Sequence, residues 1–150
     1  MVESGRFMIF FGYYEHTLDD KGRLVIPSKM RSQLSNVVYI MKGYDGALSI
    51  YHESTFAKLA AKVEEESFTR KSARDFIRIS LSSTQEMEID KQGRVQIPSL
   101  LLNKYNIGKE VVVIGAGDHI EVWNKAKYEE YEEVADKDYE INAEKLYDNK

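Results

Sequence analysis

Two arginines, each one residue after a glycine and four after an aspartate, are the residues of this sequence best suited to chemistry. They stand in the pentapeptides Asp19-Asp20-Lys21-Gly22-Arg23 and Asp90-Lys91-Gln92-Gly93-Arg94. An arginine at the tip of a β-hairpin can enter the major groove of DNA, where its guanidinium group pairs bidentately with O6 and N7 of guanine. The lysines of the same turns, Lys21 and Lys91, suit contacts with phosphate groups that fix the register of a protein on the duplex.

Two roles are open to the aspartates of these turns. Asp19 and Asp90 can accept backbone N–H bonds across the turn and orient the arginine. In the alternative, the Asp–Arg pair only locks the hairpin through an ion pair. One hairpin alone favours the alternative, whereas the recurrence of the motif, together with the family resemblance described below, favours DNA contact. The predicted DNA-binding residues are Asp19, Lys21, Arg23, Asp90, Lys91 and Arg94.

Catalytic and metal-binding motifs are absent from the sequence. The three histidines, His16, His52 and His119, do not fit a metal-ligand spacing, and the chain has no cysteine, which disfavours a zinc site. The sequence contains no nucleophile elbow, P-loop or dinucleotide-binding fingerprint. We therefore expect no enzyme activity, no catalytic residue, no metal and no cofactor.

Each motif lies in a longer repeat whose two copies are offset by 71 residues, Leu18–Ser28 and Ile89–Ser99. The aspartate and glycine predict a type I turn, and the short β-branched run after the arginine predicts a strand. The proline that follows ends strand pairing, and the serine after it can begin a short helix. The elements that position the arginines are therefore a strand, a turn, a second strand and a helix.

The similarity continues beyond that helix, since residues 37–40 resemble 111–114 and residues 48–51 resemble 120–123. Each copy then spans roughly 40 residues, which is near the lower limit for a unit that folds alone without disulfides or metals. We therefore expect the two copies to share one core around a pseudo-twofold axis.

These patterns divide the chain into four parts. They are a first repeat at 8–55, a helical connection at 56–83, a second repeat with a terminal helix at 84–135, and an acidic tail at 136–150 that we expect to fray. The expected helix caps are Ser54, Thr69 and Asn124.

A row of arginines lies along the second helix expected in the connection. Arg70, Arg74 and Arg78 stand at helical spacing with Asp75 among them. We interpret this row as a solvated face or one paired with neighbouring acids. A stripe that contacts phosphate or another subunit is the alternative.

The charge of the chain is unevenly distributed. The net charge is −4, and the segment from Asn124 onward accounts for it with five lysines and nine acidic residues. A neutral body can bind DNA if its cations lie on one face. The chain contains no apolar run long enough to span a membrane, no secretion signal and no cysteine, which together predict a cytoplasmic protein.

The doubled Asp-x-x-Gly-Arg hairpin followed by an Ile-Pro helix start resembles the MraZ family, which is related to the AbrB, MazE and SpoVT fold. Residues 11–19 and 118–123 also resemble that family. The resemblance implies a β-rich α+β fold, with two AbrB-like repeats forming a split β-barrel and helices packed outside. It also assigns DNA binding to Asp19, Arg23, Asp90 and Arg94.

The function that the resemblance implies is sequence-specific binding of double-stranded DNA, at promoter or operator repeats, by a transcriptional regulator of the division and cell-wall gene cluster. It further implies a ring-shaped homo-oligomer associated with the nucleoid. The alternative is a ring-forming interaction module whose hairpin charges make subunit contacts and which has no role on DNA.

Overall fold

The computed structural model describes residues 8–148, and its order of elements repeats. The first half contains β1 (Tyr13–Thr17), β2 (Arg23–Val25), α1 (Ser28–Arg31), β3 (Val37–Lys42), β4 (Leu48–His52), α2 (Glu53–Glu64) and α3 (Lys71–Ser83). The second half contains β5 (Gln85–Glu88), β6 (Arg94–Gln96), α4 (Ser99–Lys104), β7 (Glu110–Gly115), β8 (Ile120–Asn124), α5 (Lys125–Lys137) and α6 (Tyr139–Asp148). The fold is therefore mixed α+β and rich in strands.

Six of the strands form one antiparallel sheet in the order β1-β7-β8-β4-β3-β5. The first strand of each half pairs with the third strand of the other half: β1 pairs with β7, and β5 pairs with β3. β4 and β8 meet in the centre of the sheet, where Ile50 lies opposite Ile120. β1 therefore pairs with a strand of the second half, and β5 pairs with a strand of the first half.

The strand order reads the same in reverse when corresponding elements of the two halves are exchanged. β2 and β6 also correspond, and they pair with each other in a separate two-stranded ribbon. Leu24 lies opposite Val95 at the centre of this ribbon, and both side chains are fully buried. The ribbon therefore turns one of its faces toward the core.

The main hydrophobic core takes side chains from both halves. Its buried members include Ile26, Ile40 and Ile50 of the first half and Ile97, Val113 and Val122 of the second. Because β-branched residues alternate along the paired strands, each strand offers an apolar face to this common core.

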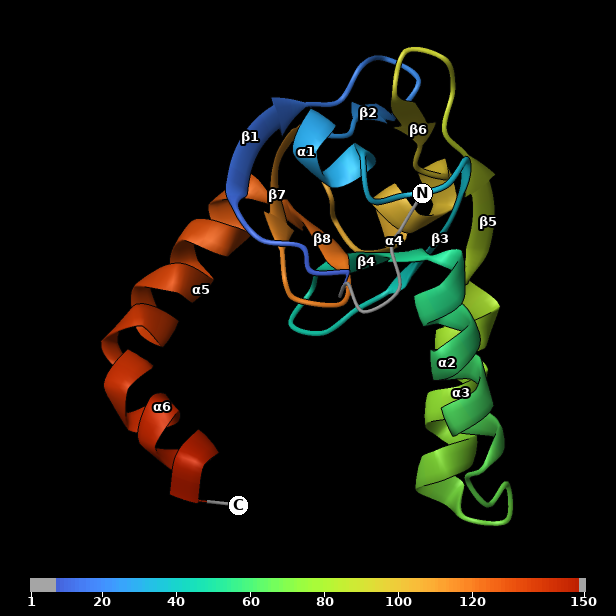
Figure 1. The fold of residues 1–150 in the computed structure, drawn as a ribbon, viewed down its shortest axis with the longest axis vertical. Helices are drawn as coiled ribbons and strands as arrows, with labels where there is room; N and C mark the ends of the chain where they lie inside the picture. Colours follow the sequence, from blue (N-terminus) through green and yellow to red (C-terminus); the bar gives the residue numbers. More distant parts are fainter. Residues whose placement is uncertain (1–7, 149–150) are drawn as a thin grey trace.

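Two pairs of helices extend from the sheet. Figure 1 shows α2–α3 and α5–α6 on opposite sides of the strands, both pointing away from the end that carries β2 and β6. As predicted, Asn124 caps α5, because its Oδ1 accepts a bond of 3.2 Å from the backbone N–H of Lys127. None of the described helices is both long and apolar enough to cross a membrane.

The two other predicted caps are wrong. The cap of α2 is His52, whose Nδ1 accepts a bond of 2.9 Å from the backbone N–H of Ser54. The cap position of α3 is Arg70, and the Thr69 hydroxyl instead bonds the Ser67 hydroxyl at 2.6 Å. A histidine nitrogen is an uncommon cap, which explains why the sequence pattern pointed to the serine.

Two expectations differ from the structure: the split barrel that the resemblance implied and the fraying that the composition of the tail suggested. The described strands close no barrel, since the edge strands β1 and β5 have one partner each in the sheet. The tail that we expected to fray is helical, because α5 runs to Lys137 and α6 covers Tyr139–Asp148. Its alanine, glutamate, lysine and leucine residues favour helix, and Glu140 in the first turn and Lys145 in the last complement the helix dipole.

Candidate nucleic-acid interface

The first Asp-x-x-Gly-Arg turn is held by its own aspartate. The backbone N–H of Gly22 donates to the carbonyl of Asp19 at 2.9 Å. Oδ1 of Asp19 accepts bonds from the backbone N–H groups of Lys21 at 2.9 Å and Arg23 at 2.8 Å. Gly22 has a φ of +76°, a conformation that glycine adopts without steric cost. The aspartate thus has the turn-closing role that the sequence suggested for it.

The second turn repeats this geometry 71 residues later. Oδ1 of Asp90 accepts bonds of 2.9 Å from the backbone N–H groups of Gln92 and Arg94. Gly93 has a φ of +78°. The two motifs therefore share their turn hydrogen bonds and the positive φ of the glycine, along with their aspartate, glycine and arginine.

Each arginine is also ion-paired with the aspartate of its own turn. Nε of Arg23 lies 2.6 Å from Oδ2 of Asp19, and Nε of Arg94 lies 2.9 Å from Oδ2 of Asp90. The ion pair of the alternative interpretation is therefore present. It engages Nε, which leaves the two Nη groups at the end of each guanidinium to face other partners. Within residues 8–148, the Nη groups of Arg23 have no hydrogen-bond acceptor, whereas Nη2 of Arg94 donates to Gln92 Oε1 at 2.8 Å.

The same contacts keep the aspartates ionised. The backbone N–H of Arg23 is the main cause that lowers the pKa of Asp19 from 3.8 to about 2, and the Arg23 side chain and the Lys21 N–H add to it. The backbone N–H of Arg94 likewise lowers the pKa of Asp90. Both ion pairs are consequently intact at neutral pH.

The ribbon of β2 and β6 places the two arginines on one face. Arg23 lies opposite Gln96, and Val25 lies opposite Arg94, on either side of the buried pair of Leu24 and Val95. Because side chains alternate along a strand, both arginines lie on the face turned away from the core. About 29% of the Arg23 side chain and 25% of the Arg94 side chain remain exposed.

The two turns are also tied to each other's strands. Ile26 donates its N–H to the carbonyl of Gly93, and Ile97 donates to the carbonyl of Gly22, both at 3.0 Å. Figure 1 shows the loops before β2 and β6 together at one end of the molecule. The structure therefore brings both predicted motifs into a single surface.

The predicted lysines are exposed at this surface, but the two turns differ in charge. Asp20 takes the place that Lys91 has in the second turn, and it pairs with Nζ of Lys109 at 2.9 Å. Lys21 takes the place of Gln92. The first turn thus has one more carboxylate than the second.

Sequence reasoning missed Arg31, which comes from α1 of the first half and lies against the second turn. Its Nη1 donates to the carbonyl of Gln92 at 3.4 Å. A Cβ added at Gly93 would lie 1.4 Å from the same Nη1 atom of Arg31. The residue 71 positions later is Leu102, which lies against Gly22 in the same way, with its Cδ1 3.0 Å from an added Cβ. The repeat offset reveals this pairing of Arg31 with Leu102, but nothing in the sequence shows that each helix reaches the other half's turn.

The row of arginines on α3 is engaged within the chain. Arg70 pairs with Glu66 at 2.6 Å, and Nη1 of Arg74 donates to the carbonyl of Thr69 at 2.8 Å. The Arg78 guanidinium lies 5.2 Å from the centre of the Phe68 ring. These contacts agree with the interpretation of α3 as a face that pairs locally. In the described part of the chain, no group of three or more His, Cys, Asp or Glu side chains could hold a metal ion.

Comparison with known proteins identifies the family. A family model described as "MraZ protein, putative antitoxin-like" matches residues 9–79 and 81–150. The protein named "Transcriptional regulator MraZ" from Moorella thermoacetica is 40% identical over 140 residues, which cover 93% of this chain and 98% of the relative. The protein of the same name from Mesoplasma florum is 42% identical over 141 residues, covering 93% of this chain and 97% of the relative.

The relatives bear the name of regulators rather than of enzymes, and the two matches of the family model agree with the repeat found in the sequence. Likeness over nearly the whole length, at this identity, is sufficient to assign a family. This chain belongs to the MraZ family of transcriptional regulators.

Proposed function

We propose that the β2–β6 ribbon and its two turns form a sequence-specific interface for double-stranded DNA. The observation that carries the proposal is that two turns with the same Asp–Arg ion pair lead into one ribbon, with Arg23 and Arg94 on its outward face. The major groove is wide enough for a two-stranded ribbon, and the guanidinium fork matches the acceptors of guanine.

The ion pairs are compatible with this role. An aspartate that holds Nε restricts the arginine to few rotamers, so less side-chain entropy is lost when the Nη groups bind a base. Arg23 and Arg94 then read bases, Asp19 and Asp90 position them, and Lys21 and Lys91 contact phosphates.

The target that we infer is the DNA that precedes the division and cell-wall gene cluster, at promoter or operator repeats. This inference rests on membership of the family and on the resemblance of the hairpins. It implies a cytoplasmic, nucleoid-associated protein, since that is where such DNA is found.

Substitution of the arginines tests the interface. Arg23→Ala or Arg94→Ala should weaken binding by about 1–3 kcal/mol per contact and relax the preference for the target over unrelated duplex. Arg→Lys keeps the charge but loses bidentate pairing, so it should lose preference while retaining non-specific affinity. Lys21→Ala and Lys91→Ala are the matched controls, which should weaken all duplexes alike. The measurement is fluorescence anisotropy with the DNA upstream of the protein's own gene and with a scrambled duplex.

Two outcomes would contradict the proposal. If Arg23→Lys and Arg94→Lys both keep full sequence preference, these arginines do not read bases. If the alanine variants unfold, as circular dichroism would report, the Asp–Arg pairs serve the hairpins alone.

The second candidate is a ring-forming interaction module that does not bind DNA. The internal Asp–Arg ion pairs favour it, because they satisfy part of each guanidinium without a ligand. Retention on duplex DNA that falls steeply with salt supports the DNA interface, whereas assembly insensitive to salt without retention supports the second candidate.

We also infer that the chain forms a ring-shaped homo-oligomer and that its halves are related by a pseudo-twofold axis. The reversed strand order and the pairing of Leu24 with Val95 support the axis. Among the described residues, β1 and β5 are the edge strands of the sheet, and the helices expose aromatic and aliphatic side chains; both features support assembly.

A further inference from the structure

The outward face of the β2–β6 ribbon carries two uncharged side chains beside its two arginines. Gln96 lies opposite Arg23, and Val25 lies opposite Arg94. We call these four residues the ribbon face. Gln96 is exposed, and Val25 is 46% exposed. Each uncharged residue therefore stands next to an arginine to which we have assigned the reading of a base.

Val25 and Gln96 occupy equivalent positions of the two repeats, since they are separated by the repeat offset of 71 residues. The arginines recur at this offset, whereas the apolar side chain of the first copy is replaced by an amide in the second. The ribbon face therefore consists of one Arg–Gln pair and one Val–Arg pair. Its two ends present different chemical groups to a ligand.

The amide of Gln96 retains the groups that adenine requires. A glutamine amide has two N–H donors and one carbonyl acceptor. Nε2 of Gln96 donates one bond to the carbonyl of Lys21 at 3.1 Å. One N–H and Oε1 remain, and they match N7 and the N6 amino group of adenine in the major groove. The bond to Lys21 also restricts the rotamers of Gln96, so that less side-chain entropy is lost on binding a base.

Val25 offers a contact of another kind. Its side chain has no donor or acceptor, and the apolar group that the major groove presents is the C5 methyl of thymine. Side chains that lie opposite each other on an antiparallel ribbon have Cβ atoms about 4.5–5.5 Å apart, and successive base pairs are about 3.4 Å apart. Two opposite side chains of the ribbon face can therefore contact neighbouring base pairs.

We propose that Gln96 and Val25 determine the sequence that the ribbon recognises. Gln96 reads an adenine next to the guanine read by Arg23, and Val25 contacts a thymine next to the guanine read by Arg94. This inference rests on the DNA interface proposed above and adds two specificity-determining residues to it.

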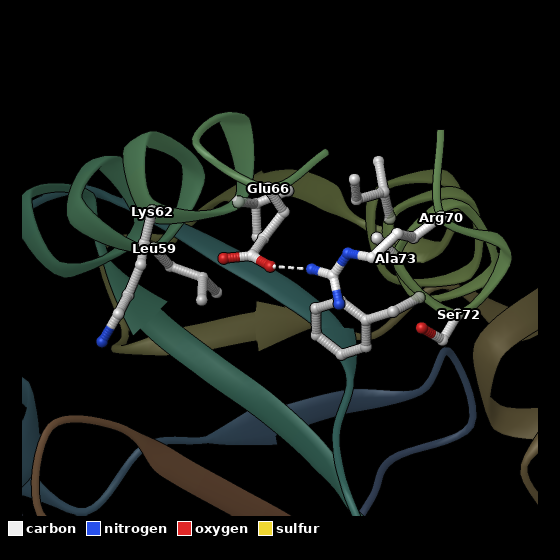
Figure 2. A pocket seen from close by; sticks show the side chains of 9 residues that line it. Leu59, Lys62, Glu66, Arg70, Ser72 and Ala73 are labelled. Atoms are coloured by element: carbon white, nitrogen blue, oxygen red, sulfur yellow. Dashed lines mark hydrogen bonds and ion pairs between the residues drawn. The ribbon is translucent and has the colours of Figure 1, made fainter. Parts of the chain in front are cut away.

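The arginine row on α3 lacks such an arrangement. Figure 2 shows Arg70 joined to Glu66 between α2 and α3, with Ser72 nearby. This ion pair of 2.6 Å uses Nη2 of Arg70, an atom of the guanidinium end that would face guanine, whereas the ribbon arginines are held through Nε. Helix α3 therefore offers positions for controls.

Selection of duplexes from a randomised pool, followed by sequencing, tests the two residues. The unmodified protein should enrich guanines with an adenine beside one and a thymine beside another. Gln96→Leu should lose the preference for adenine by about tenfold and keep the guanines. Val25→Ala should lose the preference for thymine by about fourfold. Val25→Gln should replace that thymine by an adenine, because it makes both pairs of the ribbon face Arg–Gln.

Modified bases in the selected duplex sharpen the assignment. Replacing the adenine by 7-deazaadenine, which lacks N7, should weaken binding of the unmodified protein about fivefold. Replacing the thymine by uracil, which lacks the methyl group, should weaken it about fourfold. Gln96→Leu should be insensitive to the first replacement and Val25→Ala to the second, as fluorescence anisotropy would measure.

Two controls remove exposed side chains from helices that point away from the ribbon (Figure 1). Ser72→Ala removes a polar group from α3, and Val134→Ala shortens a valine on α5. Both should select the same sequence as the unmodified protein and respond to both modified bases.

The contradicting outcomes are distinguishable. If Gln96→Leu and Val25→Ala select the unmodified sequence, these residues do not read bases, and the interface rests on the arginines alone. If either variant loses the guanines as well, its residue only positions an arginine, and the proposal is wrong for it. An unmodified protein that enriches no sequence would instead overturn the proposed function itself.

Discussion

The two Asp-x-x-Gly-Arg turns have the same backbone but different surroundings. Asp19 and Asp90 accept the same backbone N–H bonds, and the φ angles of Gly22 and Gly93 are +76° and +78°. The first turn has a second carboxylate at Asp20 and is covered by an apolar Leu102. The second has no such carboxylate and is covered by Arg31. A repeat can therefore preserve the geometry of a turn while the electrostatic potential at each copy diverges.

The largest expected effect concerns the two glycines. Gly22→Ala and Gly93→Ala both force a positive φ on an L residue, at a cost of about 1–2 kcal/mol. Gly22→Ala should be the more destabilising, because its Cβ would lie 3.2 Å from the backbone carbonyl of Ile97, which cannot move aside. At Gly93 the obstacle is the exposed, flexible end of Arg31. Urea unfolding of the two variants measures the difference, and equal losses would show that φ alone decides.

The next effect concerns Arg31. If the second turn has the stronger attraction for DNA, Arg31→Gln should reduce affinity and lower the slope of log K against log salt by about 0.9, the value for one phosphate contact. Lys58→Gln, which removes another exposed cation, from α2, is the matched control and should leave the slope unchanged. An unchanged slope for Arg31→Gln would mean that Arg31 only covers Gly93.

A smaller effect should follow when the first turn is given the charge of the second. Asp20→Lys removes a carboxylate and reproduces the lysine found at position 91. The loss of its exposed pair with Lys109 should cost about 0–1 kcal/mol of stability. DNA affinity should rise and its salt dependence should steepen, as anisotropy titrations at several salt concentrations would measure. A fall in affinity would place the first turn away from the duplex.

The smallest effect at neutral pH is the titration of the aspartates. The folded-state pKa of Asp19 is about 2, below the ordinary 3.8, so its ionised form stabilises the fold. That contribution is fully present above pH 3.8 and is lost as the pH falls toward 2. NMR of the side-chain carboxyl carbons should show Asp19 titrating near 2 and Asp90 also below its usual range. Asp19→Asn should flatten the acid limb of the stability curve, and an Asp19 that titrates near 4 would show that the ion pair is absent in solution.

Local patterns predicted the turns correctly, since an aspartate that accepts N–H bonds and a glycine at positive φ act within five residues. The repeat likewise predicted the strands that flank them. The pairing of β1 with β7 lay beyond such reasoning, because it joins residues almost 100 positions apart. The position of Arg31 over Gly93 depends on that same long-range packing. The helicity of the tail was missed because its few apolar residues suggested fraying, whereas α6 uses residues that favour helix.

The crossed pairing of the halves has a consequence for how the chain folds. While the first half is being synthesised, β1 has no strand to pair with, because β7 is made almost 100 residues later. The edge of the first half stays open until then, and the core cannot close in two independent steps. Folding is therefore governed by contacts between distant residues, which slows it relative to helical proteins of similar size. The nascent first half is the state in which this protein is most exposed to aggregation and most dependent on chaperones.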